Sequence, residues 1–538
     1  MPDGKRPWKS VYEGKVSEDT IDVSLPRLLE ETVERYGSRP VMASRGHETS
    51  YEQLLEESER LASALAAEGV AKGDRVALML PNCPEYVVSF FAVARLGAIV
   101  TQVNPIYTEQ ELKHIIDDSA AETIILHKQA YPMVAAVRDD SPLERVIVAG
   151  EAAGVGGSDT DFDRFLESAP GMAPAVKIDP GEDLAVIQYT GGTTGVSKGA
   201  MLTHHNLLCN IEQNVSLMME TPGTLEGGKS VAVAPFFHIF GTTVVLLTSI
   251  RYGMNMLLVR RFQIEEMMEL IKRERPAMLA GVATIFTALH GYPDMESYGL
   301  DEILLYVSGG ASVPIDLLES FKRRTGRPLF EGYGLSEGAP VSINTYLRGP
   351  VPGSIGIPMP STDMRIVDEE TGTEEMPLGE LGELVVKGPQ VMQGYWNMPD
   401  ETTKTLRDGW LHTGDIARME ENGYFYIVDR KKDVIIASGY NVYPREVEEV
   451  LYRHSEVVEA VAVGVPDEYR GETVKAFVVK KEGSTLTEEE LLSYCKENLA
   501  AYKVPKLLEF RDELPKSAVG KILKRVLSEE ERQDTGDR

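Results

Sequence analysis

Residues 188–204 read QYTGGTTGVSKGAMLTH, and the apolar run DLAVIQY (183–189) leads into them. A strand that enters a turn rich in Gly and Thr predicts an anion-binding loop, because glycines let backbone N–H groups approach oxygen atoms and threonine hydroxyls add donors. Lys198 would add a cation. The common phosphate-loop pattern, in which Ser or Thr directly follows Gly-Lys, is not met, because Lys198 lies between Ser197 and Gly199. Taken alone, the stretch also fits an ordinary flexible turn.

The sequence on both sides of this loop alternates between helical and strand patterns. Apolar residues recur every three or four positions in YEQLLEESERLASALAAEG (51–69) and in PEYVVSFFAVARLG (84–97), which predicts two helices. DRVALML (74–80) and AIVTQVN (98–104) predict buried strands. Further short apolar runs are ETIILH, SVAVAPF, NMLLV, AMLAGV and ILLYVSGG. Strands that alternate with helices predict parallel sheets covered on both faces.

The last third of the chain has a different texture. From about Gly349, short strands such as MRIVD, GELVVKG and YFYIVDR are separated by Gly and Pro, which predicts a small antiparallel β subdomain. After Arg430 a mixed segment with helices and strands follows, and it is long enough for a separate domain. A chain of 538 residues is also too long for one compact core.

Composition excludes some classes of function. The 55 basic and 84 acidic residues give a net charge of −29, which argues against nucleic acid as the main partner. The acidity predicts a solvated surface and leaves adaptation to high salt open. The three cysteines are far apart and favour a reducing compartment. The polar N-terminus does not resemble a secretory signal, and no run reaches the roughly 18 apolar residues of a membrane span. We therefore expect a cytoplasmic protein, with peripheral membrane contact left open.

A set of collinear motifs resembles the adenylate-forming (AMP-binding) superfamily. YTGGTTGVSKGAMLTHHN (189–206) is similar to the phosphate-loop signature of that superfamily, which includes acyl-CoA synthetases, luciferase-like enzymes and peptide-synthetase adenylation domains. The other motifs occur in the same order over more than three hundred residues: APFFHIFG (234–241), SGGA (308–311), GYGLSEG (332–338), GWLHTGD (409–415), DRKKDVIIASGYNVYPREVE (429–448) and PKSAVGKILK (515–524).

This resemblance implies a fold. We expect an α/β protein with a large N-terminal domain, residues 1–430, made of two doubly wound αβ subdomains and a small β-barrel subdomain at about 345–428. A smaller, mobile α+β C-terminal domain, residues 431–538, would follow. Enzymes of the family rotate this domain between two half-reactions, and Lys432 aligns with their hinge.

The resemblance also implies a chemistry. A carboxylate attacks the α-phosphate of ATP to give an acyl-adenylate and pyrophosphate, and a thiol then displaces AMP. Two unit charges about 4 Å apart repel by roughly 4 kcal/mol at an effective dielectric constant near 20, so the site must neutralise charge. Mg²⁺ and lysine side chains are suited to this, since Mg²⁺ prefers one or two protein oxygens together with phosphates. The expected cofactor and co-substrates are therefore Mg²⁺, ATP and coenzyme A.

Residue roles carry over by matching motifs. Thr190 and Glu337 would hold Mg²⁺, Tyr333 would stack on adenine, and Asp415 would accept hydrogen bonds from the ribose hydroxyls. The expected ATP contacts are Thr190, Gly191, Gly192, Thr193, Thr194, Gly195, Lys198, Gly310, Ala311, Tyr333, Gly334, Ser336, Asp415, Arg430 and Lys521. The expected catalytic residues are Lys521, Thr190, His238 and Glu337. Lys521 would bridge the substrate carboxylate and the α-phosphate, and a cation so placed contributes about 10²–10³ in rate. The expected CoA contacts are Ser438, Gly439 and Tyr440.

The expected substrate is a carboxylic acid. Residues 234–250, APFFHIFGTTVVLLTSI, contain no acid that could pair with the ammonium of an amino acid, and burying that charge unpaired would be costly. The expected substrate contacts are His238, Ile239, Gly241, Gly309 and Gly338. An apolar pocket gains about 0.8 kcal/mol per methylene, which favours a medium- or long-chain fatty acid.

Departures from the family pattern keep alternatives open. Gly191 replaces a common Ser, Ser336 replaces a common Thr, and GVATIF (281–286) lacks a common Pro. The Gly-Gly pair at 191–192 and the stretch EGYGLSE (331–337) look most like bacterial and archaeal fatty acyl-CoA synthetases, whereas the missing Pro leaves the wall of the acyl pocket open. An aryl-CoA ligase of the 4-coumarate type, an adenylate-forming enzyme with another acceptor, and a luciferase-like oxygenase are the alternatives. A homodimer is left open.

Overall fold

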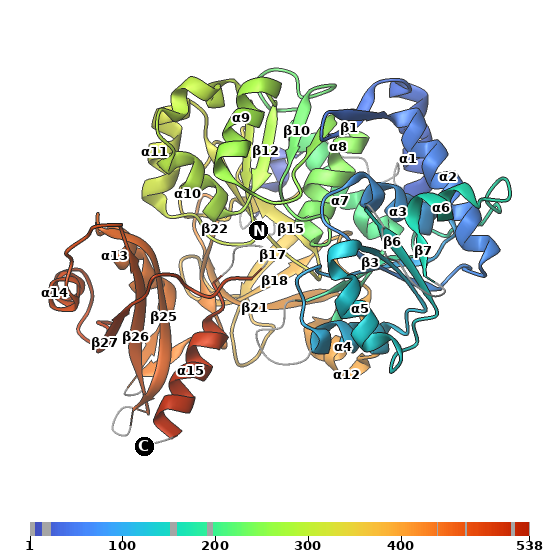
Figure 1. The fold of residues 1–538 in the computed structure, drawn as a ribbon. Coiled ribbons are helices and arrows are strands. Elements are labelled where there is room, and N and C mark those ends of the chain that lie inside the picture. Colours follow the sequence, from blue (N-terminus) through green and yellow to red (C-terminus); the bar gives the residue numbers. More distant parts are fainter. Residues whose placement is uncertain are drawn as a thin grey trace.

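The protein is described by a computed structural model that covers residues 6–12, 23–150, 159–190, 197–437, 440–467, 471–517 and 522–536. Within these ranges two large sheets with helices on their faces make up most of the chain, and a smaller C-terminal part stands beside them (Figure 1). The predicted α/β class, with a large N-terminal part and a smaller C-terminal part, is confirmed.

Several helices begin at a side-chain cap. Ser50, Thr203 and Thr487 each accept a hydrogen bond from the third residue of the helix that follows, in a capping box. The described helices are α1 (Leu25–Tyr36), α2 (Tyr51–Ala67), α3 (Pro84–Arg95), α4 (Glu109–Ser119), α5 (Tyr131–Arg138), α6 (Phe162–Glu167), α7 (His204–Met218), α8 (Thr248–Arg251), α9 (Ile264–Glu274), α10 (Ala283–Gly291), α11 (Ile315–Thr325), α12 (Pro399–Thr405), α13 (Pro444–Tyr452), α14 (Glu488–Asn498) and α15 (Lys524–Gly536). A π-helix, Gly241–Leu247, precedes α8. None of the described helices is long and apolar enough to span a lipid bilayer.

The first large sheet contains the Gly- and Thr-rich loop at one side. Its strands lie in the order β19 (Gly394–Tyr395), β9 (Gly199–Thr203), β8 (Leu184–Tyr189), β4 (Ile99–Gln102), β3 (Arg75–Met79), β5 (Thr123–His127), β6 (Arg145–Ala149) and β7 (Thr160–Asp161). Strands β8 to β7 of this order run parallel, whereas β9 and β19 are antiparallel to their neighbours. The predicted helices α2 and α3 and the predicted strands β3, β4 and β5 are all present.

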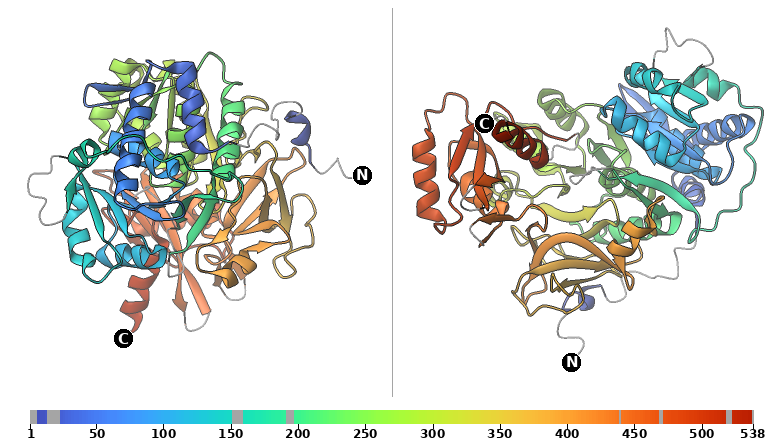
Figure 2. Two further views of the ribbon diagram at one scale, coloured as in Figure 1. Left: turned by 90° about the vertical axis from the view of Figure 1, so that its right-hand side faces the viewer. Right: turned by 90° about the horizontal axis from the view of Figure 1, so that it is seen from below.

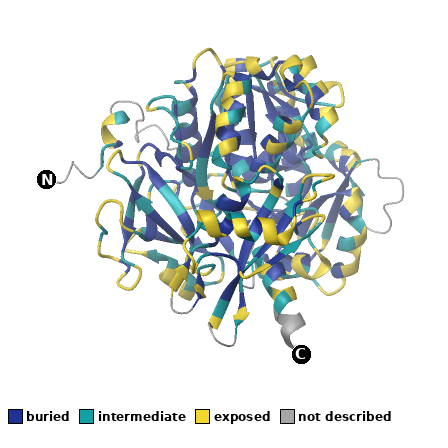
Figure 3. Ribbon diagram, turned by 90° about the vertical axis from the view of Figure 1, so that its left-hand side faces the viewer, coloured by how far each residue is buried: buried dark blue, intermediate teal, exposed yellow. Residues whose placement is uncertain are grey.

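The second large sheet has the same parallel centre. Its strands lie in the order β16 (Ile357–Pro358), β15 (Ala339–Ile343), β14 (Leu329–Leu335), β13 (Leu305–Ser308), β12 (Met278–Gly281), β10 (Lys229–Ala232), β11 (Asn255–Leu258), β1 (Pro40–Ser44) and β2 (His47–Ser50). The middle strands, β14 to β1, are parallel, and the strands at both edges are antiparallel. Figure 3 shows that the strands are mostly buried, with exposed residues on the outer faces of the helices.

Two smaller sheets complete the fold. The first is antiparallel and contains β17 (Asp363–Val367), β18 (Gly382–Lys387), β21 (Trp410–Met419), β20 (Leu406–Arg407) and β22 (Phe425–Arg430). The second, in the C-terminal part, contains β24 (Tyr440–Val442), β23 (Ile435–Ala437), β26 (Gly471–Lys480), β25 (Val457–Asp467) and β27 (Leu507–Phe510). The C-terminal part has hydrophobic clusters of its own, built from residues such as Val447, Leu451 and Phe477.

The N-terminal segment fastens the antiparallel sheet. Figure 2 shows the N-terminus beside this sheet, which is drawn in orange. Nε of Arg6 donates to both carboxylate oxygens of Asp363, at 2.7 and 2.8 Å. Trp8 is buried and packs edge-on against Phe425, with ring centroids 5.5 Å apart. This segment therefore packs against β17 and β22 and holds to both of them.

Candidate active site

The predicted site residues are only partly described. Outside the described ranges lie Gly191, Gly192, Thr193, Thr194, Gly195, Ser438, Gly439 and Lys521. Among the others, one group of contacts links the phosphate-loop residue Lys198 to Glu337. A second group links Tyr333, Asp415 and Arg430.

The hairpin β8–β9 fixes the base of the Gly- and Thr-rich loop. Tyr189 pairs with Gly199 across the hairpin, and the N–H of Thr190 donates to the carbonyl of Lys198 at 2.9 Å. The N–H of Lys198 donates to Oγ1 of Thr190 at 3.3 Å. A Cβ on Gly199 would lie 2.6 Å from Ile187, so only glycine fits where the loop rejoins the sheet. Thr190 and Lys198 therefore lie side by side at the loop base.

Lys198 and Glu337 meet through a third residue, Tyr395. Nζ of Lys198 lies 4.6 Å from the centroid of the Tyr395 ring and 3.3 Å from Oε2 of Glu401. The Tyr395 hydroxyl donates to Oε1 of Glu337 at 2.6 Å. Burial, followed by the charge of Glu337, raises the pKa of Tyr395, so this hydroxyl stays protonated and remains a donor.

The two predicted metal ligands are of types that suit Mg²⁺. Glu337 has a carboxylate and Thr190 a hydroxyl, and this ion is commonly held by one or two protein oxygens together with phosphates. Among the described residues there is no group of three or more acidic, His or Cys side chains that could form an all-protein cage. The phosphates of a nucleotide would complete such a site.

Close packing requires several glycines of the nucleotide motifs. A Cβ on Gly334 would lie 2.4 Å from the carbonyl oxygen of Ala339, and one on Gly309 would lie 2.9 Å from the Phe240 ring. Gly310 has a φ of +82°, which favours glycine. Ala311 follows it and is half-buried. The backbone can therefore approach a flat ligand closely here.

Tyr333, Asp415 and Arg430 form the second group. Asp415 on β21 pairs with Arg430 on β22, and Nε of Arg430 lies 3.0 Å from Oδ1 of Asp415. The Tyr333 hydroxyl donates to Oδ2 of the same carboxylate, which is only 2% exposed. Each carboxylate oxygen keeps a second lone pair, so ribose hydroxyls could still donate to it.

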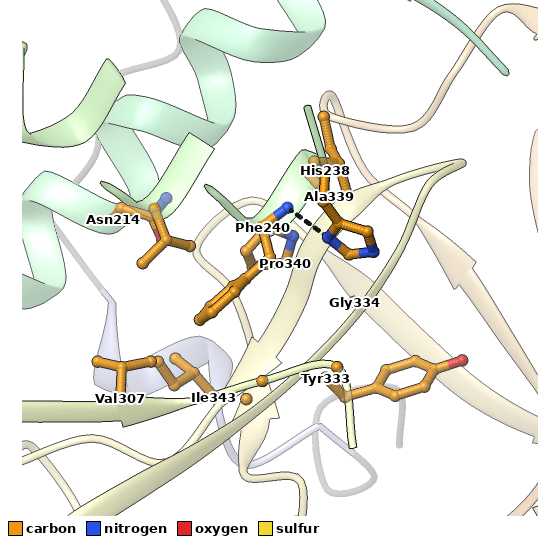
Figure 4. Close-up of a pocket in the computed structure, with 14 residues that line it drawn as sticks. Asn214, His238, Phe240, Val307, Tyr333, Gly334, Ala339, Pro340 and Ile343 are labelled. Atoms are coloured by element: carbon orange, nitrogen blue, oxygen red, sulfur yellow. Dashed lines mark hydrogen bonds between the residues drawn. The ribbon is translucent and has the colours of Figure 1, made fainter. Parts of the chain in front are cut away.

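An apolar pocket opens between these motifs. Its cavity volume is about 40 Å³, and the empty space around it, part of which is open to solvent, comes to about 440 Å³. Figure 4 shows His238 and Tyr333 on one side of it, and Asn214, Val307 and Ile343 on the other. The N–H of Phe240 donates to Nδ1 of His238 at 3.3 Å, which fixes the imidazole ring. Also among the lining residues are Ile239, Val244, Gly309, Gly310, Gly332, Gly334, Ala339 and Pro340.

Two predicted substrate contacts lie away from that lining. A Cβ on Gly241 would lie 2.0 Å from the carbonyl oxygen of Pro235, so Gly241 allows the loop to turn into the π-helix. Gly338 and Ser336 lie in the turn between β14 and β15, where the N–H of Gly338 donates to the carbonyl of Leu335 at 3.1 Å. These residues shape the site through the backbone.

Comparisons with known proteins identify the family of the chain. Residues 29–396 match the AMP-binding enzyme family, and residues 446–521 match the AMP-binding enzyme C-terminal domain. The chain belongs to the AMP-binding enzyme family. The resemblance predicted from the motifs is thereby confirmed.

Three similar proteins illustrate the range of the family. The long-chain-fatty-acid–CoA ligase of Bacillus subtilis (strain 168) is 42% identical, over 98% of either chain. The feruloyl-CoA synthase of an Amycolatopsis species is 37% identical, over 89% of this chain and 93% of its own. The solved structure of ATP-bound MatB from Rhodopseudomonas palustris is 32% identical, has a TM-score of 0.85, and covers 94% of this chain and 99% of its own.

Some residues that organise the site of this AMP-binding enzyme were missed by motif reasoning. Asn82, between β3 and α3, donates to the carbonyls of Ala232 and Ala234, both at 2.9 Å, and accepts from the N–H of Phe236 at 2.8 Å. The Tyr86 hydroxyl donates to the Phe236 carbonyl at 2.8 Å. These bonds hold the loop that leads to the pocket. In the sequence, the polar residue Asn82 shortly after the buried strand β3 was the feature that could have indicated this role.

Motif reasoning also missed a row of polar residues along one face of α7. Its side-chain amides are buried and donate to proline carbonyls in two separate loops and in strand β15. The bonds run from Asn206 to Pro389 (2.8 Å), Asn210 to Pro340 (2.9 Å) and Gln213 to Pro360 (2.6 Å). Their spacing of four and three residues places them on one helix face, and polar residues at that spacing in an otherwise apolar helix were the signal. The helix that follows the phosphate loop of the AMP-binding enzyme thus fixes loops around the pocket.

The hinge region joins the C-terminal part to β22. Lys432 lies exposed in the turn between β22 and β23. The N–H of Arg445, in the first turn of α13, donates to Oδ2 of Asp429 at 2.8 Å, and its guanidinium donates to the Ile427 carbonyl at 2.9 Å. The predicted CoA contact Tyr440 is 58% exposed and stacks on Tyr502 at 4.9 Å.

Proposed function

We propose that this chain is an ATP-dependent, AMP-forming acid–CoA ligase that activates fatty acids. The observation that carries the proposal is the position of the apolar pocket. It is lined at the same time by His238 from the predicted substrate motif and by Gly309, Gly310 and Tyr333 from the predicted adenine motif. An acid whose tail fills this pocket would bring its carboxylate next to a nucleotide held by Tyr333 and Asp415.

The reaction has two steps. In the first, a carboxylate oxygen of the acid bonds to the α-phosphorus of ATP, and the bond to the bridging oxygen breaks, releasing pyrophosphate. In the second, the sulfur of coenzyme A bonds to the acyl carbon, and AMP leaves with the electron pair of the acyl–oxygen bond. Mg²⁺, when bound, would screen the charge of the phosphates. Lys198 lies at the base of the phosphate loop and adds a positive charge there.

The lining of the pocket supports a fatty acid as substrate. Within the described residues the lining contains no acidic side chain, so an amino acid's ammonium would be buried without a partner. The residues at the far side from His238 are mostly aliphatic, and each buried methylene contributes about 0.8 kcal/mol. The long-chain-fatty-acid–CoA ligase of Bacillus subtilis, 42% identical, points the same way.

An aryl acid is the second candidate, and the feruloyl-CoA synthase relative at 37% identity favours it. A panel of saturated C8 to C16 acids and of benzoate- and coumarate-type acids, with AMP and thioester release measured separately, decides between them. A fatty acid ligase should show kcat/KM rising with chain length across the panel. Activity confined to aryl acids would refute the first candidate, and AMP release without thioester would refute coenzyme A as the acceptor.

We also propose that the C-terminal part, residues 431–538, rotates about Lys432 between the two steps and brings Lys521 to the phosphates. Lys521→Ala should then slow adenylate formation by at least about 10²–10³-fold and spare thioester formation from supplied acyl-adenylate. An equal loss in both steps would contradict this role.

We further propose a cytoplasmic location, supported by three cysteines that are buried and, within the described residues, form no disulfide with one another. Cell fractionation would test it. Homodimer formation and peripheral membrane contact stay predictions, which sedimentation and vesicle flotation would test.

A further inference from the structure

The segment 392–396, between β18 and α12, contacts the phosphate-loop hairpin and the turn of Glu337 at once. Its strand β19 pairs with β9, with Tyr395 opposite Ala200. The N–H of Trp396 donates to the carbonyl of Gly199 at 2.7 Å, and the N–H of Met392 donates to the carbonyl of Glu337 at 2.8 Å. Backbone hydrogen bonds therefore fix this segment to both halves of the predicted phosphate and metal site.

The side chain of Tyr395, in the same segment, also contacts both halves of the predicted site. It is only 4% exposed. Its hydroxyl donates to Oε1 of Glu337 at 2.6 Å, and its ring lies 4.6 Å from Nζ of Lys198. The hydroxyl thus contacts the predicted metal ligand, and the face of the ring supports the cation of the phosphate loop.

These contacts orient the side chains of Glu337 and Lys198. A hydrogen bond from a neutral donor to a carboxylate is stronger than one between neutral groups, so it holds Oε1 of Glu337 on Tyr395 and turns Oε2 to another partner. A lysine over an aromatic face is attracted by the electron-rich ring. Glu401 forms an ion pair with the same ammonium, 3.3 Å from Lys198, and it is itself held by Lys404 at 2.7 Å.

We propose that Tyr395 is a positioning residue that holds Glu337 and Lys198 at a fixed spacing for a metal-bound triphosphate. The inference rests on the proposed function, because the role of Glu337 as a metal ligand does. Tyr395 acts through these two side chains and makes no contact with the reacting atoms.

The test uses Tyr395→Phe in the full-length protein, since this variant keeps the ring and removes only the hydroxyl. Titration calorimetry measures ATP binding with Mg²⁺ and, separately, with a chelator. We expect the Mg²⁺-dependent affinity to fall about tenfold or more, with little change in the affinity for metal-free ATP. The Mg²⁺ concentration for half-maximal adenylate formation should rise in parallel, while thioester formation from supplied acyl-adenylate stays unchanged.

Tyr189→Phe is the matched control. Tyr189 lies on strand β8, and its hydroxyl donates to Oδ2 of Asp118 at 2.6 Å. This variant therefore loses a similar, partly buried hydrogen bond to a different carboxylate. It should keep the Mg²⁺-dependent affinity. A double-mutant cycle with Glu337→Gln adds a second measure, because Tyr395→Phe should cost nothing further once the carboxylate is gone.

Three results would overturn the inference. The first is an equal loss in the Tyr189 and Tyr395 variants. The second is a Tyr395→Phe variant that weakens metal-free ATP as much as the magnesium complex. The third is additive losses in the cycle with Glu337→Gln. Failure of the proposed function is separate: it would appear in the unmodified protein as no adenylate formed with any acid.

Discussion

Glu331 carries a buried carboxyl group directly before the nucleotide motif at Gly332 and Tyr333. It is 7% exposed on strand β14. Oε1 accepts a hydrogen bond from the N–H of Val313 at 3.0 Å, and Oε2 is buried with no hydrogen-bond partner among the described residues. Burial raises the pKa of Glu331 to about 7, against the opposing effects of the Val313 N–H and the Arg445 cation. The ionised form of this carboxyl group is therefore costly in the folded protein.

The cost has a defined dependence on pH. The pKa of Glu331 in the folded protein lies above the ordinary value of 4.5. Below about pH 4.5 the carboxyl group is protonated in both the folded protein and the unfolded chain, so it does not lower the stability of the fold there. As the pH rises through 4.5 towards about 7, the unfolded chain loses this proton before the folded protein does, and stability falls. The difference between 4.5 and about 7, at about 1.4 kcal/mol per pH unit, amounts to about 3 kcal/mol.

Glu331→Gln removes this titration and keeps the shape of the side chain. We expect the variant to match the parent protein near pH 5 and to exceed its stability by up to about 3 kcal/mol near pH 8. Urea unfolding of both proteins at a series of pH values gives the difference directly. The same transition must be compared each time, because a chain of several domains need not unfold in one step.

Glu319→Gln is the control, because Glu319 is an exposed glutamate on α11 and the substitution makes the same chemical change without touching a buried carboxyl group. A stability difference for Glu331→Gln that stays flat from pH 5 to pH 8 would refute the reasoning. A variant that is less stable than the parent at pH 8 would show that Arg445 or another partner more than compensates the buried charge.

Three further changes test other parts of the structure. Burial lowers the pKa of His204 to about 4, and its Nδ1 accepts a hydrogen bond from the N–H of Leu25. The stability of the folded protein should therefore fall as the pH drops from about 6.5 towards 4. In His204→Asn, unfolding measured over the same pH range should lose this dependence of stability on pH. Asn82→Ala removes three hydrogen bonds to the loop before the pocket and should lower kcat/KM for the acid at least about tenfold, measured against unchanged ATP affinity. Gly334→Ala would place a methyl group 2.4 Å from the Ala339 carbonyl and should weaken ATP binding about tenfold or more in calorimetry.

Local patterns predicted much of the fold because they reflect local physics. The apolar spacing of α2 and α3 and the short apolar runs of β3, β4 and β8 determine which face each element buries, and all five elements are present. The phosphate loop could also be placed from sequence, since Gly199 and its neighbours follow a buried strand directly. Side-chain capping by Thr203 then starts α7 where the motif ends.

The contacts that organise the site could not be predicted in the same way. Tyr395 and Glu337 are 58 positions apart, and Asn82 and Phe236 are 154 positions apart. No periodicity relates such pairs, because a buried hydrogen bond between distant segments depends on how the sheets pack against each other. The motif resemblance named Glu337 and Lys198 separately, and only the fold shows that one tyrosine touches both.

The charges of the described site residues bear on how the proposed site would hold a triphosphate. Lys198 faces Glu401, Arg430 faces Asp415, and Glu337 adds a third carboxylate, so these five side chains carry a net charge of −1 at neutral pH. A triphosphate that enters this site is not drawn in by a surplus of lysine and arginine, as it would be in a strongly basic site. Under the proposed function, its charge would be balanced by a divalent cation on Glu337, by the predicted loop contacts, and by a lysine brought from elsewhere in the chain. On this account, ATP binding should depend steeply on Mg²⁺ and only weakly on the charge of Lys198, because Lys198 already interacts with Glu401. Lys198→Met should therefore weaken Mg²⁺-dependent binding less than Glu337→Gln does, and the reverse order would show that the loop lysine is the dominant phosphate contact.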